Sequence, residues 1–160
     1  MGRVVDLVTA VRQTDAARAA GRRIVLANGC FDVLHVGHVR YLEGAKAAAG
    51  LLVVGVNSDA SVTSLKGEGR PLLSDAARAE LVAALEPVDL VVVFEGDTVS
   101  GLIRALRPHV HCKGTDYTEG SVPEREVTRE VGGTTRIVGD PKDHGTRDLI
   151  ARVRERFGRR

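Results

Sequence analysis

Two histidines, His35 and His38, stand three residues apart with Gly37 between them, shortly after an apolar segment that ends at Asn28. The free amide groups at the start of a helix carry a partial positive charge and attract phosphate. Imidazoles placed there can donate hydrogen bonds to phosphoryl oxygens without fixing a full positive charge. Glycine lets a ligand approach the backbone closely. The spacing therefore predicts chemistry on a phosphate group at a junction between a strand and a helix.

The stretch from Gly29 to His38 reads Gly-Cys-Phe-Asp-x-x-His-x-Gly-His. It resembles the HxGH signature of nucleotidyltransferases with a Rossmann-like fold. The resemblance implies transfer of a nucleotidyl group from ATP or CTP to a phosphate-bearing acceptor, with release of pyrophosphate. The alternative is that both histidines only cap a helix.

Further segments of the chain extend this resemblance to one family, the D-glycero-β-D-manno-heptose 1-phosphate adenylyltransferases. They lie in family order at residues 57–67, 70–71, 78–85, 88–89, 106–108 and 113–117. The pattern Lys-Gly-x-Asp-Tyr over residues 113–117 is the most diagnostic against related cytidylyltransferases. Relatives are often one half of a bifunctional protein with a sugar-kinase half. Since no kinase half accompanies this sequence, it resembles the stand-alone form.

The resemblance implies roles for individual residues. His35 and His38 would hold the triphosphate and stabilise charge at the α-phosphorus. Lys66 would neutralise the acceptor phosphate or the reacting phosphoryl group, because fixed positive charge lowers the barrier when two anions meet for in-line attack; the alternative is a solvated surface charge. The remaining residues expected at the nucleotide are Gly29, Cys30, Phe31, Asp32, Gly37, Asn57, Asp59, Arg70, Lys113, Gly114, Asp116, Thr146 and Arg147.

Several alternatives remain for the charged residues near the motif. Asp32 could orient a histidine, cap the turn or contact magnesium. Arg70 and Arg78 are candidates for anion contacts, and Arg78 is equally compatible with an exposed charge on a helix. Metal ions normally bridge the nucleotide phosphates in this chemistry, and no carboxylate pair here forms a complete protein site. We therefore expect Mg²⁺ to arrive with ATP and no metal ion to be held by the protein alone.

The start of the final helix departs from the family pattern. Relatives carry a Ser-Thr-Thr run there, whose hydroxyl and amide groups cradle the β- and γ-phosphates. The matching stretch here is Gly145, Thr146, Arg147 and Asp148, which keeps one hydroxyl. Arg147 could replace the lost donors with a charged, two-pronged contact to pyrophosphate oxygens. The alternative is that Arg147 points to solvent.

A second loop of interest follows a short expected strand at residues 110–112. Lys113 can reach an anion there, and Gly114 permits close approach of a nucleotide or sugar. The alternative is a simple turn in which Asp116 bonds to its own backbone.

Histidine and cysteine side chains near the same strand suggest a metal site only weakly. Alternation along a strand puts His109 and His111 on one face and Cys112 on the other. No third ligand is evident, so we do not expect a structural metal there. Cys30 is expected to be a small buried side chain rather than a nucleophile, because nucleotidyl transfer needs no covalent thiol.

The elements that must position these residues alternate along the chain. Apolar runs predict strands at 24–28, 51–56, 88–94, 110–112 and 134–138. Helical spacing, caps and stops predict helices at 4–20, 39–49, 58–65, 75–85, 98–106, 123–131 and 146–157. Strands that are apolar on both faces and alternate with helices are typical of a covered parallel sheet. We predict one doubly wound, Rossmann-like α/β domain over residues 1–160 with a five-stranded parallel sheet, its site beyond the carboxyl ends of the strands.

Composition narrows the function classes. The 160 residues are 43% hydrophobic, 28% charged and 3% aromatic, with a net charge of +2. This excludes a disordered chain and argues against nucleic-acid binding by rows of stacking rings or a polyanion-coating surface. No apolar run approaches the ~20 residues of a membrane span, and the first 20 residues lack the apolar centre of a signal peptide. We expect a cytoplasmic protein.

The arginines of the C-terminus, Arg152, Arg154, Arg156, Arg159 and Arg160, read as a solvated helix face, with an RNA-binding tail as the alternative.

The leading hypothesis is an adenylyltransferase that converts ATP and D-glycero-β-D-manno-heptose 1-phosphate, or a close sugar 1-phosphate, into ADP-heptose and pyrophosphate. The resemblance also implies a homodimer, with no nucleic-acid or membrane partner. One alternative is a cytidylyltransferase acting on glycerol 3-phosphate or a similar phospho-alcohol, which an assay of ATP against CTP separates. Another, of a different class, is a non-catalytic nucleotide- or RNA-binding module, which would release no pyrophosphate.

Overall fold

A six-stranded parallel sheet forms the centre of the computed structural model, which describes residues 1–48, 50–141 and 145–158. The strand order is β1-β4-β3-β2-β5-β6, and every pair of neighbours is parallel. The expected covered parallel sheet of an α/β domain is confirmed. The strands are β1 (Arg3–Val4), β2 (Ile24–Gly29), β3 (Leu51–Asn57), β4 (Leu90–Phe94), β5 (Val110–Lys113) and β6 (Thr134–Ile137).

The expectation of five strands was wrong by one, because the sheet gains a two-residue edge strand at the N-terminus. The Arg3 amide donates to the Asp89 carbonyl oxygen at 3.1 Å, and the Val5 amide donates to the Val91 carbonyl oxygen at 2.9 Å. These bonds hold the residues that were expected to open the first helix. The helix begins at Leu7 instead, where the Asp6 carboxylate accepts the Thr9 amide at 2.7 Å.

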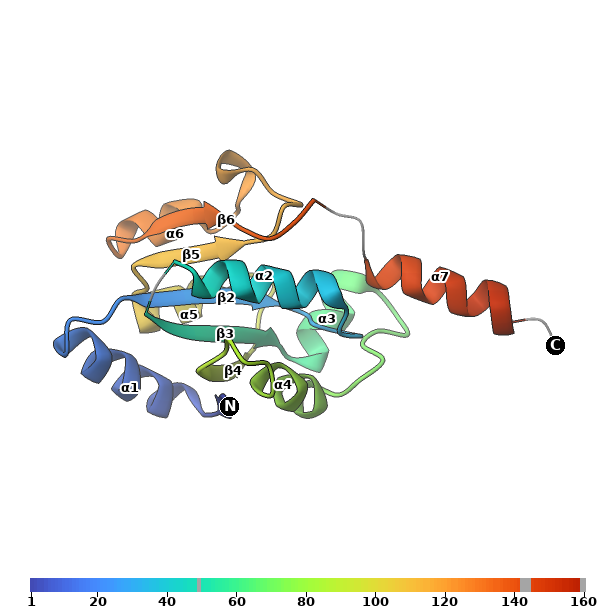
Figure 1. The fold of residues 1–160 in the computed structure, drawn as a ribbon, viewed down its shortest axis with the longest axis horizontal. Helices are drawn as coiled ribbons and strands as arrows, with labels where there is room; N and C mark the ends of the chain where they lie inside the picture. The colour runs from blue at the N-terminus through green and yellow to red at the C-terminus, as the bar shows by residue number, and fades with distance from the viewer. Residues whose placement is uncertain (49, 142–144, 159–160) are drawn as a thin grey trace.

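Helices cover both faces of the sheet, and Figure 1 shows α2 in front of it and α5 behind it. The α-helices are α1 (Leu7–Ala19), α2 (Val36–Lys46), α3 (Asp59–Lys66), α4 (Asp75–Ala83), α5 (Ser100–Leu106), α6 (Arg125–Glu130) and α7 (Thr146–Phe157). A 3₁₀ turn, η1 (Glu119–Ser121), precedes α6. The α2 helix starts three residues before the expected residue 39, so the whole His-x-Gly-His motif lies at its first turn.

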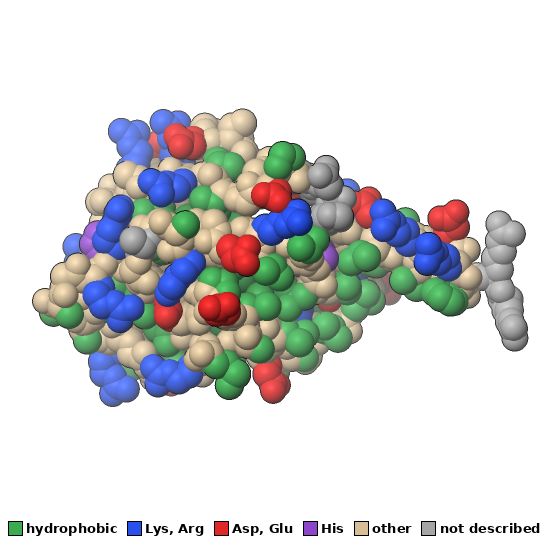
Figure 2. Space-filling view, in the orientation of Figure 1, with side chains coloured by type: hydrophobic (Ala, Val, Ile, Leu, Met, Phe, Trp, Pro, Cys, Tyr) green, Lys and Arg blue, Asp and Glu red, His purple; other side chains and the backbone are tan. Residues whose placement is uncertain are grey.

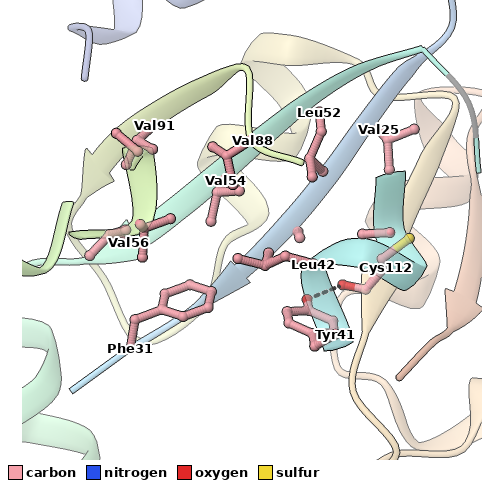
Figure 3. Close-up of a cluster of buried hydrophobic side chains, with 14 of the residues drawn as sticks. Val25, Phe31, Tyr41, Leu42, Leu52, Val54, Val56, Val88, Val91 and Cys112 are labelled. Carbon is pink, nitrogen blue, oxygen red and sulfur yellow. Dashed lines mark hydrogen bonds between the residues drawn. The ribbon is translucent and has the colours of Figure 1, made fainter. Parts of the chain in front are cut away.

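Alternation along β2 divides the core into two layers. Val25 and Ala27 pack with residues of α2 and α4, whereas Ile24 and Leu26 pack with residues of α1 and α5. Figure 3 shows the first layer, in which the Tyr41 hydroxyl donates to the Cys112 carbonyl oxygen at 2.7 Å. This bond fixes α2, and with it the histidine motif, against the end of β5.

The strand order changes direction at β2, which has β3 on one side and β5 on the other. In open α/β sheets, ligands bind outside the carboxyl ends of the strands at such a switch point. The loops that follow β2 and β5 are therefore the positions where the topology favours a ligand. Across the three described ranges, we find no helix with both the length and the apolar character that crossing a bilayer requires.

Candidate active site

The loop from β2 to α2 is tightly wound around a buried aromatic anchor. Phe31 and Val33 adopt positive φ angles of 50° and 66°, which bulky residues rarely do. Phe31 is only 2% exposed and packs into the core. This anchoring holds the loop in a conformation that carries His35 to the N-cap position of α2 and His38 into its first turn.

The two histidines of the motif lie face to face. Their ring centroids are 3.9 Å apart with the planes tilted by 30°. The His35 amide donates to Nδ1 of His38 at 3.3 Å. An Nδ1 atom that accepts a hydrogen bond carries no proton, so the neutral His38 ring carries its proton on Nε2. Burial, and then the charge of His35, lower the pKa of His38 to about 4.

Asp32 is committed to the backbone and side chain of a distant loop. Its carboxylate accepts the amides of Leu72 and Leu73 at 2.9 and 3.1 Å and Nε of Arg70 at 2.7 Å. Burial alone would raise the pKa of Asp32, but these hydrogen bonds and the Arg70 charge together outweigh it and lower that pKa. Of the three roles expected for Asp32, the structure favours capping, with the loop after α3 as its partner.

Arg78 is completely buried, which excludes the alternative of an exposed charge on a helix. Its guanidinium donates to the Leu73 carbonyl oxygen at 2.9 Å, to the Cys30 carbonyl oxygen at 2.6 Å and to the Asp59 carboxylate at 2.7 Å. One side chain thus ties the loop between β2 and α2 to the first residue of α3 and to the segment between α3 and α4. Asp59, which was expected at the nucleotide, forms the ion pair with Arg78.

Lys66 is the last residue of α3 and is exposed. The helix ends there because Gly67 takes a φ of 92°. Lys66 lies close enough to Cys30 for its charge to lower the pKa of that thiol, although burial, the larger effect, leaves the pKa raised. The Cys30 thiol also approaches Oδ1 of Asn57 at 3.9 Å. Cys30, in the loop between β2 and α2, thus contacts Asn57 at the end of β3, and the end of α3 places Lys66 near enough for its charge to act on Cys30.

A buried polar cluster lies where β2 and β5 end. Oδ1 of Asn28 contacts Nε2 of His111 at 2.9 Å and Nζ of Lys113 at 3.4 Å. Lys113 also pairs with Glu124 at 3.6 Å and stands 5.0 Å from the centre of the Tyr117 ring. Burial lowers the pKa of Lys113, and Glu124 only partly offsets this effect.

The other residues expected in this region lie around that cluster or elsewhere. Gly114 and Asp116 follow β5 in a loop, with Asp116 exposed. His109 accepts the Ile24 amide on Nδ1 at 2.9 Å, so it stabilises the start of β2 rather than the site. Among the described residues, no three His, Cys, Asp or Glu side chains gather in a way that could hold a metal ion.

Helix α7 projects from the body of the molecule beside the loop between β2 and α2 (Figure 1). The Thr146 hydroxyl donates to the Asp32 carbonyl oxygen at 3.1 Å, which attaches the helix start to the loop between β2 and α2. Arginine and apolar side chains are both exposed along the helix (Figure 2). Arg159 and Arg160 lie outside the described residues.

Two cavities flank α7 on different sides. One, of about 300 Å³, is lined by Leu34, His35, Val36, Gly145, Asp148, Leu149 and Arg152. The other, of about 630 Å³, is lined by Glu68, Gly69, Arg70, Leu72, Arg147, Ile150, Ala151 and Arg154. Arg147, expected beside the triphosphate, therefore faces the cavity of Arg70 rather than the cavity of His35.

The sequence analysis assigned no role at the site to Asn28 or Arg154. Asn28 is the second-last residue of β2 and contacts His111 and Lys113 of β5, and its place before Gly29 was the available signal. Arg154 lines the larger cavity, and a single arginine among several on one helix gave no signal of this.

Comparisons with known proteins agree with this geometry. The chain matches the cytidylyltransferase-like family over residues 26–154. It is 50% identical over 143 residues to the bifunctional protein HldE of Pelobacter propionicus and 48% identical over 143 residues to HldE of Geobacter sulfurreducens, covering 89% of this chain in each case. The chain spans about 29% of the length of these relatives.

A solved structure is also similar, that of a lipopolysaccharide core biosynthesis protein from Thermoplasma volcanium. It has a TM-score of 0.61 and 26% sequence identity, and the match covers 73% of this chain and 94% of that chain.

Proposed function

This chain belongs to the cytidylyltransferase-like family, and we propose that within it the chain is a sugar-phosphate adenylyltransferase. AMP passes from ATP to D-glycero-β-D-manno-heptose 1-phosphate, or to a close sugar 1-phosphate, giving ADP-heptose and pyrophosphate. The similarity to HldE proteins and the Lys-Gly-x-Asp-Tyr pattern support this choice of substrates. The observation that carries the reaction class is the neutral His38 ring, with its proton on Nε2, at the first turn of α2.

In the proposed reaction an oxygen of the acceptor phosphate attacks the α-phosphorus of ATP directly. A bond forms from that oxygen to the α-phosphorus, while the bond to the oxygen that bridges to the β-phosphate breaks and pyrophosphate leaves. Nε2–H of His38 and the free amides of α2 donate to phosphoryl oxygens as charge develops. Lys66 supplies positive charge where the two anions meet.

Hydrogen bonds of the buried Asp32 and Arg78 side chains position His38 and Lys66 in the proposed reaction. Asp32 and Arg78 bind the segment between α3 and α4 to the loop between β2 and α2. Lys66 stands at the start of that segment and His38 at the end of that loop. A lysine at the end of a helix reaches a reacting group only if its backbone is held, so these two buried residues are positioning residues in the proposal.

Mg²⁺ bound to the phosphates of ATP would neutralise charge on the leaving pyrophosphate. The protein residues around the loop between β2 and α2 do not fit a metal site of their own, because the Asp32 carboxylate already accepts two amides and an arginine. The metal is therefore proposed to come with the nucleotide.

The decisive experiment is a matrix of ATP, CTP, GTP and UTP against heptose 1-phosphate, glucose 1-phosphate, mannose 1-phosphate and glycerol 3-phosphate, read by pyrophosphate release. We expect ATP with heptose 1-phosphate to give the highest kcat/KM. Preference for CTP with glycerol 3-phosphate would favour the cytidylyltransferase alternative, which the family match keeps open. Nucleotide binding with no pyrophosphate release from any pair would favour a binding module.

The family resemblance also predicts a homodimer in the cytoplasm, with no nucleic-acid or membrane partner. Sedimentation velocity at two protein concentrations tests the dimer, and a mass of one chain at both contradicts it.

A further inference from the structure

The larger cavity beside α7 has arginine side chains on both walls. Arg70 lies on the wall formed by the loop after α3, and Arg147 and Arg154 lie on the wall formed by α7. Arg70 is already paired with Asp32 at 2.7 Å. Within the described ranges, neither Arg147 nor Arg154 lies within 4.0 Å of a carboxylate oxygen. Both arginines thus line the cavity, and among the described residues no hydrogen bond or ion pair engages their guanidinium groups, which suits an anion with several oxygens.

The other lining residues suit the organic part of a phosphorylated ligand. Glu68 supplies a carboxylate that can accept hydrogen bonds from hydroxyl groups, and Leu72 and Ile150 supply apolar contacts. The volume of about 630 Å³ lies within the range of small-molecule sites. The lining therefore combines phosphate donors, a hydroxyl acceptor and apolar surface, which is the chemistry that a sugar phosphate needs.

The position of this cavity separates it from the histidine motif. His35 lines the smaller cavity, together with Asp148 and Arg152 of α7, whereas Arg147 and Arg154 lie on a different side of the helix. An in-line displacement brings the attacking oxygen to phosphorus from the side opposite the leaving group. The nucleotide and the phosphate-bearing acceptor therefore need two separate spaces on different sides of the loop between β2 and α2. The hydrogen bond from Thr146 to Asp32 places the start of α7 between them.

We propose that the cavity lined by Arg70, Arg147 and Arg154 binds the phosphate-bearing acceptor, with Arg154 and Arg147 as its anion contacts. The assignment of the ligand as acceptor rests on the proposed nucleotidyl transfer. The smaller cavity beside His35 is left for part of the nucleotide. This moves Arg147 away from the triphosphate role that the sequence suggested and gives Arg154 a role that the sequence did not.

The test compares Arg154→Ala and Arg147→Ala with Arg156→Ala. Arg156 is a matched control, because it is an exposed arginine of the same helix that lines neither cavity. KM is measured separately for ATP and for heptose 1-phosphate. We expect Arg154→Ala to raise the acceptor KM about 10-fold or more, as for loss of a charged hydrogen bond. The KM for ATP should stay within about 2-fold, as should both constants in Arg156→Ala.

Calorimetry keeps this inference separate from the proposed function. Heptose 1-phosphate, glycerol 3-phosphate and inorganic phosphate are each titrated into the wild-type chain and the three variants without ATP. Weaker binding of any of these phosphates to Arg154→Ala, but not to Arg156→Ala, supports the cavity as a phosphate site even if no substrate pair is turned over. A selective rise of the ATP KM in Arg154→Ala would assign the cavity to nucleotide phosphates and overturn the proposal. Equal behaviour of the Arg154 and Arg156 variants in both assays would also overturn it.

Discussion

Nε of Arg70 donates to the buried carboxylate of Asp32 over 2.7 Å, although the two residues are 38 positions apart in the sequence. The same carboxylate accepts the amides of Leu72 and Leu73. The loop that carries the histidine motif and the loop that follows Lys66 are therefore held as one unit. The ionised Asp32 carboxylate has only acceptor oxygens, which match the donors of Arg70, Leu72 and Leu73. Protonation of Asp32 would therefore weaken these hydrogen bonds and loosen the contact between the two loops.

Asp32→Asn should therefore cost stability in a pH-dependent way. We expect a loss of about 1–3 kcal/mol at pH 7, since the change removes the charge opposite Arg70 and leaves buried amide donors poorly matched. The folded pKa of Asp32 is below its ordinary value of 3.8. The difference from wild type should be full above that value and disappear as the pH falls through the folded pKa.

Urea unfolding at pH 7 and at successively lower pH values measures this difference. Asp140→Asn is the matched control, because Asp140 makes an exposed ion pair with Arg40 at 2.8 Å. Such exposed pairs contribute less than about 1 kcal/mol. Equal losses in the two variants at pH 7 would contradict a special role for Asp32.

His38→Ala should lower kcat about 10²-fold or more, the scale for removal of one preorganised donor to a developing oxyanion. The variant should remain folded, as judged by its circular dichroism and its melting temperature. Near wild-type turnover would remove His38 from the catalytic residues. His38→Gln should retain more activity than His38→Ala, because its amide can donate near the position of Nε2.

The pH profile of kcat/KM, which reports the pKa values of the ligand-free enzyme, tests the protonation state of the same residue. A His38 pKa of about 4 leaves the ring neutral from pH 8 down to about pH 5. We therefore expect no rise of kcat/KM as the pH falls through 6.5. Such a rise, absent in the His38→Gln variant, would show that the imidazolium is the active form and that the neutral-donor mechanism is wrong.

The sequence predicted most of the sheet because β2, β3 and β4 are rich in apolar residues on both faces and need no partner to be recognised. The edge strand β1 carried no such signal, since two residues have no measurable period and their pairing with β4 is a tertiary event. Likewise, the HxGH spacing predicted the histidine pair. The bonds of Asp32 to the loop after α3 depend on how two loops meet, which spacing along the chain does not encode.

Arg78 shows the same limit for a single side chain. An arginine on an amphipathic helix is normally exposed, and its burial here is tolerated because three acceptors from separate segments surround the guanidinium. Two of those acceptors are backbone carbonyl oxygens, of Cys30 and Leu73, which leave no trace in the residue types. His109 and His111 looked similar in the sequence, yet one bonds to a backbone amide and the other to Asn28.

Lys66→Ala should reduce kcat more than it reduces ATP affinity. A charge that follows the reacting phosphoryl group acts mainly in the transition state, so its loss appears in kcat. ATP binding by calorimetry is compared with turnover at saturating ATP, and Lys66→Arg serves as the variant that keeps the charge. If ATP binding collapses while turnover at saturation is unchanged, Lys66 is only a nucleotide clamp.

The stability of the protein should fall as the pH drops below about 6.5, because His111 is fully buried and resists protonation. Burial, and then the charge of Lys113, lower the pKa of His111 to about 3. Between about pH 6.5 and pH 3 the unfolded chain binds a proton on this ring that the folded chain does not, so stability rises with pH by up to about 1.4 kcal/mol per pH unit from this group. His111→Gln keeps a donor for Asn28 and should reduce that slope by about the same amount. His109→Gln is the control, because the less buried His109 should change the slope less. Urea unfolding between pH 7 and pH 4 measures the slopes, and an unchanged slope in His111→Gln would show that His111 takes up its proton in the folded protein.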